Sequence, residues 1–112
     1  MLERQNGTKS DLCVVITTFE TIDSARQFGT HLVESQLAAC VNLVPGVESI
    51  YRWKEKVERE SEIIALIKTR REKLDELERR VQEKHPYEEP EFVVIDVKAG
   101  SSGYLDWIRE NT

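Results

Sequence analysis

Between residues 37 and 53 the chain reads Leu37-Ala-Ala-Cys-Val-Asn-Leu-Val-Pro-Gly-Val-Glu-Ser-Ile-Tyr-Arg-Trp53. Proline has no N–H to donate to a ladder, so Pro45-Gly46 marks a kink, a bulge or a sheet edge. The pattern predicts a strand over residues 39–44 that bends once and resumes over residues 47–53. A long strand with an unpaired edge often pairs with a second copy of the same protein.

The composition around this stretch is that of a small, charged and acidic domain. The chain has 112 residues, with 16 lysines and arginines against 21 aspartates and glutamates, and a net charge of −5. This length predicts one domain, and the acidic balance argues against nucleic-acid binding through bulk electrostatics. The N-terminal residues are polar, so we expect a flexible extension at 1–10 and a single folded domain at 11–112.

The sequence also indicates the compartment in which the protein works. No apolar run approaches the roughly 20 residues that span a bilayer, and the polar N-terminus lacks a signal-peptide core. Cys13 and Cys40 both lie among apolar residues, which favours buried thiols in a reducing compartment. We therefore expect a cytoplasmic protein that does not bind membranes.

Hydrophobic periodicity predicts the remaining elements. Buried strands are predicted over residues 12–18, 63–69 and 92–97. Helices are predicted over residues 21–35, 70–84 and 104–108. Thr21 or Asp23 would cap the first helix, and Gly29 within it would permit close packing. The segment Lys54–Glu62 has seven charges in nine residues, which is typical of a solvated hairpin turn.

The order of these elements, β-α-β-β-α-β-α, predicts an α+β protein. A split pair of β-α-β units gives an antiparallel sheet with both main helices on one face. This is the ferredoxin-like βαββαβ sandwich, here followed by a C-terminal helix. The other face of the sheet would be bare and apolar, and a dimer or trimer of sheets would cover it.

Several separated motifs carry a family resemblance. They are Leu37–Gly46, Ile50-Tyr-Arg-Trp53, Ile67-Lys-Thr69, His85-Pro-Tyr87, Pro90-Glu91 and Tyr104-Leu-x-Trp107. In this order and spacing the chain resembles the CutA family of divalent-ion tolerance proteins. The resemblance implies a ferredoxin-like homotrimer whose long hairpins pair across subunits, similar to the PII signalling proteins. It also implies a cytoplasmic protein linked to tolerance of copper and other divalent ions, with no agreed catalytic activity.

Cys40 and His85 are the candidate metal ligands, since a soft thiolate and an imidazole both suit copper. Each has a structural alternative. A lone cysteine between alanine and valine is usually a small buried residue, and His85 is placed to close a helix C-terminus. Some family members carry a second histidine and a cysteine where this chain has Lys84 and Thr17, which weakens the case for a His/Cys site. No cofactor is expected to be required, and Cu²⁺ or another divalent metal is the candidate ligand.

Other motif positions are expected to line a cleft between subunits. They are Trp53, Lys68, Tyr87 and Glu62. Trp53 is favoured as an interface anchor, because tryptophan is enriched at interfaces. Lys68 would receive an anionic ligand, or would pair with a carboxylate such as Glu62 or Glu91.

Three functions are compatible with these residues. The first, which we favour, is a homotrimeric binding or regulatory protein connected with divalent metals. The second is a PII-like signalling module whose inter-subunit clefts bind a small anionic effector. The third is an enzyme that uses Lys68 and His85. Since the sequence has no nucleophile–base spacing and no phosphate loop, we expect no enzymatic activity.

Overall fold

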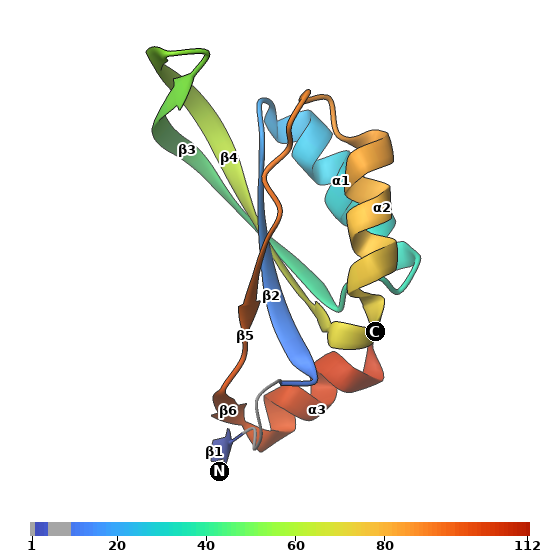
Figure 1. Cartoon of the computed structure of the whole chain (residues 1–112). Helices are drawn as coiled ribbons and strands as arrows, with labels where there is room; N and C mark the ends of the chain where they lie inside the picture. The colour runs from blue at the N-terminus through green and yellow to red at the C-terminus, as the bar shows by residue number, and fades with distance from the viewer. Residues whose placement is uncertain (1, 5–9) are drawn as a thin grey trace.

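A computed structural model describes residues 2–4 and 10–112 of the chain. Its main body is a four-stranded antiparallel sheet in the order β3-β4-β2-β5 (Figure 1). The strands are β2 (Leu12–Phe19), β3 (Cys40–Trp53), β4 (Lys56–Arg70) and β5 (Val93–Asp96). This order is the ferredoxin-like one, and the predicted α+β architecture is confirmed.

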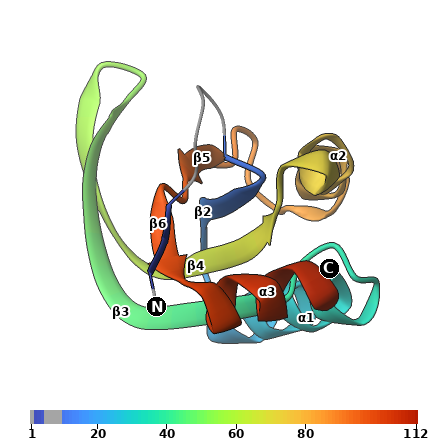
Figure 2. The same ribbon diagram turned by 90° about the horizontal axis from the view of Figure 1, so that it is seen from below.

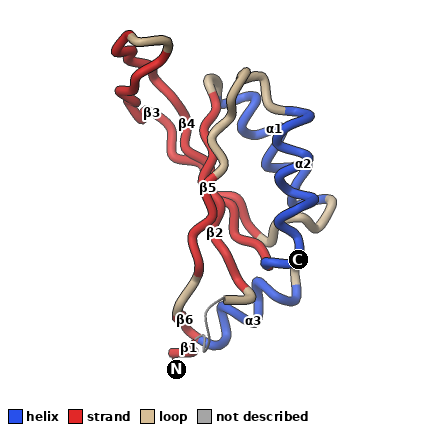
Figure 3. The backbone as a smooth tube through the Cα atoms, viewed as in Figure 1, coloured by secondary structure: helices blue, strands red, loops and turns tan. Residues whose placement is uncertain are grey.

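Two helices, α1 (Ile22–Glu34) and α2 (Leu74–Lys84), cover one face of the sheet (Figure 3). A short 3₁₀ helix, η1 (Arg71–Lys73), leads into α2. The Thr21 side chain caps α1 as predicted, since its Oγ1 accepts a hydrogen bond of 3.1 Å from the Ser24 N–H. Among the described helices, none is long and apolar enough to cross a membrane.

The core lies between this helix pair and the sheet. Its buried side chains include Val15, Phe19, Ile63 and Ile67 from the strands, and Phe28, Leu32, Leu77 and Val81 from the helices. A Cβ placed on Gly29 would lie 3.3 Å from Cγ1 of Val41. The missing side chain therefore allows α1 to approach β3 closely, as the sequence predicts.

The opposite face of the sheet is covered only at one end. There α3 (Ser102–Glu110) lies over the strands, and Leu105 and Ile108 pack with Leu12 and Ala39. The rest of this face, here called the bare sheet face, consists of side chains that the chain leaves partly or fully accessible. They are Val14, Ile16, Val44, Ile64, Leu66, Val93 and Ile95. Side chains alternate along a strand, so the strands that build the core also build this face.

The β3–β4 hairpin extends past the body and curves away from the helices (Figure 2). The pairing register shifts between Val44 and Val47, and Gly46 has a φ of +73°, which confirms the predicted bend. The ladder then continues to the Trp53–Lys56 pair. Only residues 54–55 form the turn, so the charged run predicted as a turn is mostly strand.

Residues 2–4 and 10 are the described part of the segment expected to be a flexible extension at 1–10. Leu2–Arg4 form a strand, β1, that pairs antiparallel with β6 (Ala99–Ser101). Ser10 is buried, and its Oγ accepts a hydrogen bond from the Leu12 N–H at 3.0 Å. Residues 1 and 5–9 of the expected extension lie outside the described part of the chain. The described N-terminal residues therefore pack on the domain.

Candidate functional site

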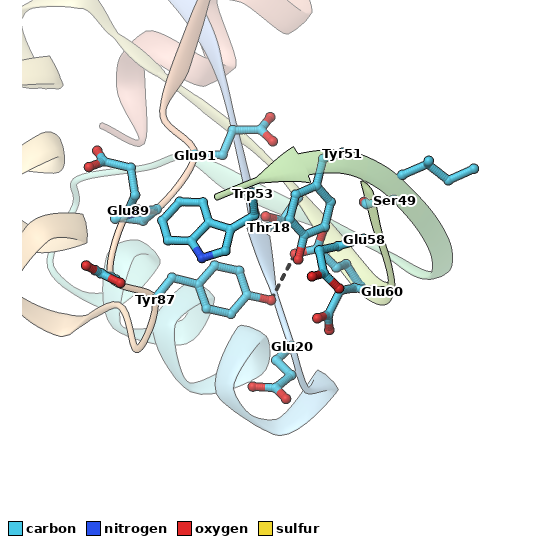
Figure 4. Close-up of a pocket in the computed structure, with 14 residues that line it drawn as sticks. Thr18, Glu20, Ser49, Tyr51, Trp53, Glu58, Glu60, Tyr87, Glu89 and Glu91 are labelled. Carbon is cyan, nitrogen blue, oxygen red and sulfur yellow. Dashed lines mark hydrogen bonds between the residues drawn. The ribbon is translucent and has the colours of Figure 1, made fainter. Parts of the chain in front are cut away.

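A cleft of about 880 Å³ lies between the extended part of the hairpin and the body of the domain (Figure 4). Its walls come from the hairpin strands, from the end of β2 with the residue that follows it, and from the segment 87–91 before β5. Seven of its lining residues are glutamates, and we call it the glutamate cleft. They are Glu20, Glu58, Glu60, Glu62, Glu88, Glu89 and Glu91. No lysine or arginine of the described chain lines it.

One wall of this cleft is formed by side chains that alternating strand geometry puts on the same face of β3 and β4. In the ladder Tyr51 is opposite Glu58 and Ser49 is opposite Glu60, so these side chains share one face of the hairpin. Trp53 continues the same face toward the tip. The result is a wall of aromatic rings and carboxylates that faces the body of the domain (Figure 4).

Glu62 is the buried carboxylate of the cleft. It is 9% exposed, and its Oε2 accepts a hydrogen bond of 2.9 Å from the Tyr87 hydroxyl. Partial burial, together with this hydrogen bond, raises the pKa of Tyr87. Burial and the neighbouring Glu62 charge also raise the pKa of Glu91. Among the described residues, the hydrogen-bond donor to this carboxylate is the neutral Tyr87 hydroxyl, and a buried carboxylate is stabilised further when a cation lies beside it.

His85 supports the cleft but does not open into it. Its Nδ1 accepts a hydrogen bond of 3.1 Å from the Tyr87 N–H, so Nε2 carries the proton and donates to the Thr18 carbonyl at 2.5 Å. The ring stacks on Phe19 with centroids 4.5 Å apart. Burial lowers the pKa of His85. Both nitrogens of the neutral ring are therefore occupied, and neither is free to bind a metal.

The structure does not bring Cys40 and His85 together within one chain. Cys40 is opposite Lys68 in the ladder, and its Sγ lies 3.7 Å from Oδ1 of Asn42. His85 contacts Thr18, which is opposite Ile64. Four residues along a strand span about 13 Å. In the described residues, no group of three or more His, Cys, Asp or Glu side chains could hold a metal ion.

Lys68 also lies away from the cleft of its own chain. Its Nζ donates to the Tyr104 hydroxyl at 3.0 Å and lies 5.2 Å from the centroid of that ring. This hydrogen bond raises the pKa of Lys68. Six residues separate Lys68 from Glu62, about 20 Å along a strand. Of the four residues expected to line a cleft between subunits, one chain alone brings together Trp53, Tyr87 and Glu62, and Lys68 of the same chain lies elsewhere.

Several residues of the site were not singled out from the sequence. They are Glu20, Glu58, Glu60, Glu88 and Glu89. The signal for the hairpin carboxylates was present: glutamates at positions 58, 60 and 62 recur with the period of two that places them on one strand face. The charged run was interpreted as a turn, where this period has no meaning.

Comparisons with known proteins point to the same family that the sequence motifs resemble. A family model described as CutA1 divalent ion tolerance protein matches residues 13–111. The divalent-cation tolerance protein CutA of Thermus thermophilus is 46% identical over 99 residues, which are 88% of this chain and 96% of that protein. Protein CutA of Homo sapiens is 42% identical over 88 residues, which are 79% of this chain and 49% of that protein.

Solved structures of CutA proteins superpose on most of this chain. CutA from Synechococcus elongatus gives a TM-score of 0.91 at 38% identity, covering 99% of this chain and 95% of that one. The divalent cation tolerance protein from Thermus thermophilus gives a TM-score of 0.87 at 44% identity, covering 90% of this chain and 98% of that one.

Proposed function

The chain belongs to the CutA1 divalent ion tolerance protein family, and from this membership we propose that it is a homotrimeric protein that binds divalent cations in the response to metal ions. The observation that carries the proposal is the glutamate cleft, where seven carboxylates gather without a lysine or arginine. We propose a binding or regulatory role in the cytoplasm, without catalysis.

The chemistry of the cleft favours cations over anions. A small anionic effector, the alternative that the sequence analysis kept open, would meet only carboxylates and aromatic rings in the cleft of one chain. The lysine that was expected to receive it contacts Tyr104 instead. An enzyme that uses Lys68 and His85 together is not supported either, because the ring nitrogens of His85 are both occupied. We therefore keep the metal-response function and set the other two aside.

Carboxylates are the better candidates for direct metal contact than the thiol and the imidazole. Glu62 and Glu91 interact electrostatically in the cleft, and carboxylate oxygens suit divalent cations that accept oxygen ligands. No ready group of three ligands exists in the described residues. We propose that water, or a second copy of the chain, completes the coordination.

The bare sheet face supports the homotrimer. Val93 and Ile95 on β5 are each about half exposed, and they lie beside Ile16 and Val14 in the ladder. Together with the apolar residues of β3 and β4 they form a contiguous apolar surface, which monomeric proteins rarely expose. A cyclic trimer that packs three such faces around one axis would bury it, in the PII-like arrangement that the family resemblance implies.

Calorimetric titration tests the cation proposal. We would titrate Cu²⁺, Zn²⁺ and Mn²⁺ into the wild-type protein, a Glu62→Gln/Glu91→Gln variant and a His85→Ala/Cys40→Ala variant. We expect at least tenfold weaker binding in the glutamine variant. If only the His85→Ala/Cys40→Ala variant loses binding, the ligand assignment is wrong, and if no ion binds to the wild type, direct binding is excluded.

Light scattering after size-exclusion chromatography tests the assembly. One chain has a mass of 13.0 kDa, and we expect about three times this mass. A monomer at micromolar concentration would contradict the trimer.

A further inference from the structure

The carboxylates of the glutamate cleft are spread along it rather than gathered at one point. Glu58, Glu60 and Glu62 lie on one face of β4, and alternate residues of a strand are about 7 Å apart. In the described part of the chain no group of three or more such ligands could hold a metal ion. An elongated ligand with several separated positive charges therefore fits the whole row better than a single ion does.

Glu62 offers an unused acceptor at the inner end of this row. The residue is 9% exposed, and its Oε2 accepts the hydrogen bond from the Tyr87 hydroxyl. Its other oxygen, Oε1, accepts no hydrogen bond within the described chain and is not one of its fully buried unpaired atoms. Oε1 is therefore accessible from the cleft, where a carboxylate gains from a cationic donor.

Aromatic rings line the same cleft. Tyr51 and Trp53 come from β3, and Tyr87 comes from the segment before β5 (Figure 4). The face of such a ring attracts an ammonium group, most strongly in tryptophan, and its apolar surface packs against methylene groups. The Lys54 ammonium lies 5.7 Å from the centroid of the Trp53 ring, so this ring already attracts an amine of the chain itself. The cleft thus provides both the charges and the apolar surface that an aliphatic amine needs.

We propose that the glutamate cleft binds a linear aliphatic polyamine, a methylene chain that carries several protonated amines. The amines pair with Glu58, Glu60 and Oε1 of Glu62. The methylene groups between them pack on the rings of Tyr51 and Trp53. This inference goes beyond the metal response proposed above, because it uses the same cleft but needs no metal.

Calorimetric titration of the full chain with butylamine, putrescine and spermidine tests the site. These probes carry one, two and three amines, and a phosphate buffer avoids a competing amine. We expect the affinity to rise about fivefold with each added amine and to fall with added salt, which screens exposed charges. Spermidine that binds no more tightly than butylamine would overturn the proposal.

Matched variants separate a site from general attraction to an acidic protein. Glu58→Gln/Glu60→Gln should weaken spermidine binding about tenfold, since it removes two charged partners. Glu78→Gln/Glu110→Gln removes the same charge from α2 and α3 and should leave the affinity unchanged. Equal weakening in both variants would overturn the proposal.

A pair of substitutions at Tyr51 tests the ring contact. Tyr51→Leu removes the ring and should weaken spermidine binding several-fold, whereas Tyr51→Phe keeps the ring and should bind like the wild type. Circular dichroism of both variants shows whether the fold is retained. Equal affinities in the two folded variants would exclude the ring from the site.

Tryptophan fluorescence locates the bound amine. The chain has two tryptophans: Trp53 lines the cleft, and Trp107 lies on α3 outside it. Spermidine should change the emission of Trp53 in a Trp107→Phe chain and leave that of Trp107 unchanged in a Trp53→Phe chain. The reverse pattern would overturn the placement in the cleft.

The same titrations keep this proposal separate from the metal response. Metal binding without spermidine binding would overturn the polyamine site and leave the metal response intact. Spermidine binding to a protein that binds no metal ion would support the polyamine site and overturn direct metal binding.

Discussion

His85 is held as a neutral ring by contacts on every side. It is 8% exposed, and its two nitrogens bond to the Thr18 carbonyl and the Tyr87 N–H. The backbone N–H of His85 also donates to the Val81 carbonyl at 2.9 Å, at the end of α2. The residue therefore connects the end of α2, the end of β2 and the wall of the cleft.

We expect His85 to make the stability of the protein depend on pH near neutrality. Burial lowers its folded pKa below the usual value of about 6.5, so the unfolded chain binds the proton more readily. The free energy of unfolding is then fully retained above about pH 6.5 and falls as the pH drops toward the folded pKa. Urea unfolding between pH 5 and 8, at one protein concentration, measures this slope.

The matched variants are His85→Gln and His31→Gln. Glutamine at position 85 cannot take up the proton and should flatten the slope, whereas the wild-type slope should largely persist in His31→Gln. An unchanged slope in His85→Gln would assign the effect to other groups.

We expect the Tyr87–Glu62 contact to contribute to stability. Tyr87→Phe removes the hydroxyl that donates to the buried carboxylate, and such a loss costs about 1–3 kcal/mol. In the background of Glu62→Leu, where no carboxylate needs a donor, the same change should cost less. A double-mutant cycle from urea unfolding measures the difference, and equal costs in both backgrounds would show that the pair is not coupled.

The sequence predicted the surroundings of some single residues but not the contacts that form the site. Cys13 was correctly placed in the core, where it is 1% exposed. Lys68 and Glu62 were predicted to line a cleft between subunits; within one chain six residues along one strand separate them by about 20 Å, so only different copies could bring them together. The occupancy of both nitrogens of His85 depends on Thr18, a residue far away in the sequence, so no local pattern contains it.

At the scale of elements, the β3–β4 hairpin follows from one bend and one short turn. The bend at residues 45–46 was predictable, because proline and glycine leave few other interpretations. The turn was not, since Lys54 and Glu55 both have positive φ, 49° and 69°, in a two-residue loop where Asn-Gly is the usual signal. Where the hairpin extends past the body, both of its faces are largely exposed. Charged residues therefore occur in its strands as well as in its turn, and a charged run does not tell the two apart.

We expect Gly46→Ala to destabilise the protein by about 1 kcal/mol, the cost of a left-handed backbone for a residue with a Cβ. No atom lies within 4 Å of the position that the new Cβ would take, so this backbone strain is the whole effect. Gly103→Ala is the control. It also places a Cβ in open space, but within α3 and without a positive φ, and should stabilise by up to about 1 kcal/mol. Thermal unfolding of both variants measures the two changes in stability. If both substitutions shifted stability in the same direction, this account would be wrong.

At the scale of the whole molecule, periodicity was sufficient for the order of elements and for the bare sheet face. It was not sufficient for β1, because Leu2–Arg4 pair with residues 99–101 at the other end of the chain. Arg109 joins these distant segments, since its guanidinium donates to Glu3 and to Asp11. Such a contact between chain ends has no periodic signal in the sequence.

We expect Trp53 to contribute more to assembly than Trp107. Both rings are 40% exposed, but Trp53 lies in the wall of the glutamate cleft, while Trp107 stacks on Tyr104 of its own helix with ring centroids 5.6 Å apart. Trp53→Ala should raise the dissociation concentration of the proposed trimer roughly 30-fold, as for a central interface residue. Trp107→Glu should change it less, and sedimentation velocity distinguishes the two. Equal effects would remove Trp53 as the anchor.

The two-residue turn of the hairpin also has a consequence for the order in which the chain folds. β3 and β4 are neighbours in sequence, so closing their contact costs little chain entropy, whereas β5 must find β2 across most of the chain. Non-local pairing of this kind is slow. The hairpin should therefore form first, and the surface made by β2 and β5 last. The surface made by β2 and β5 is part of the bare sheet face that is proposed to pack between copies, so assembly should wait for it. Refolding should accordingly show a fast phase that is independent of protein concentration, followed by a slow phase whose rate rises with concentration.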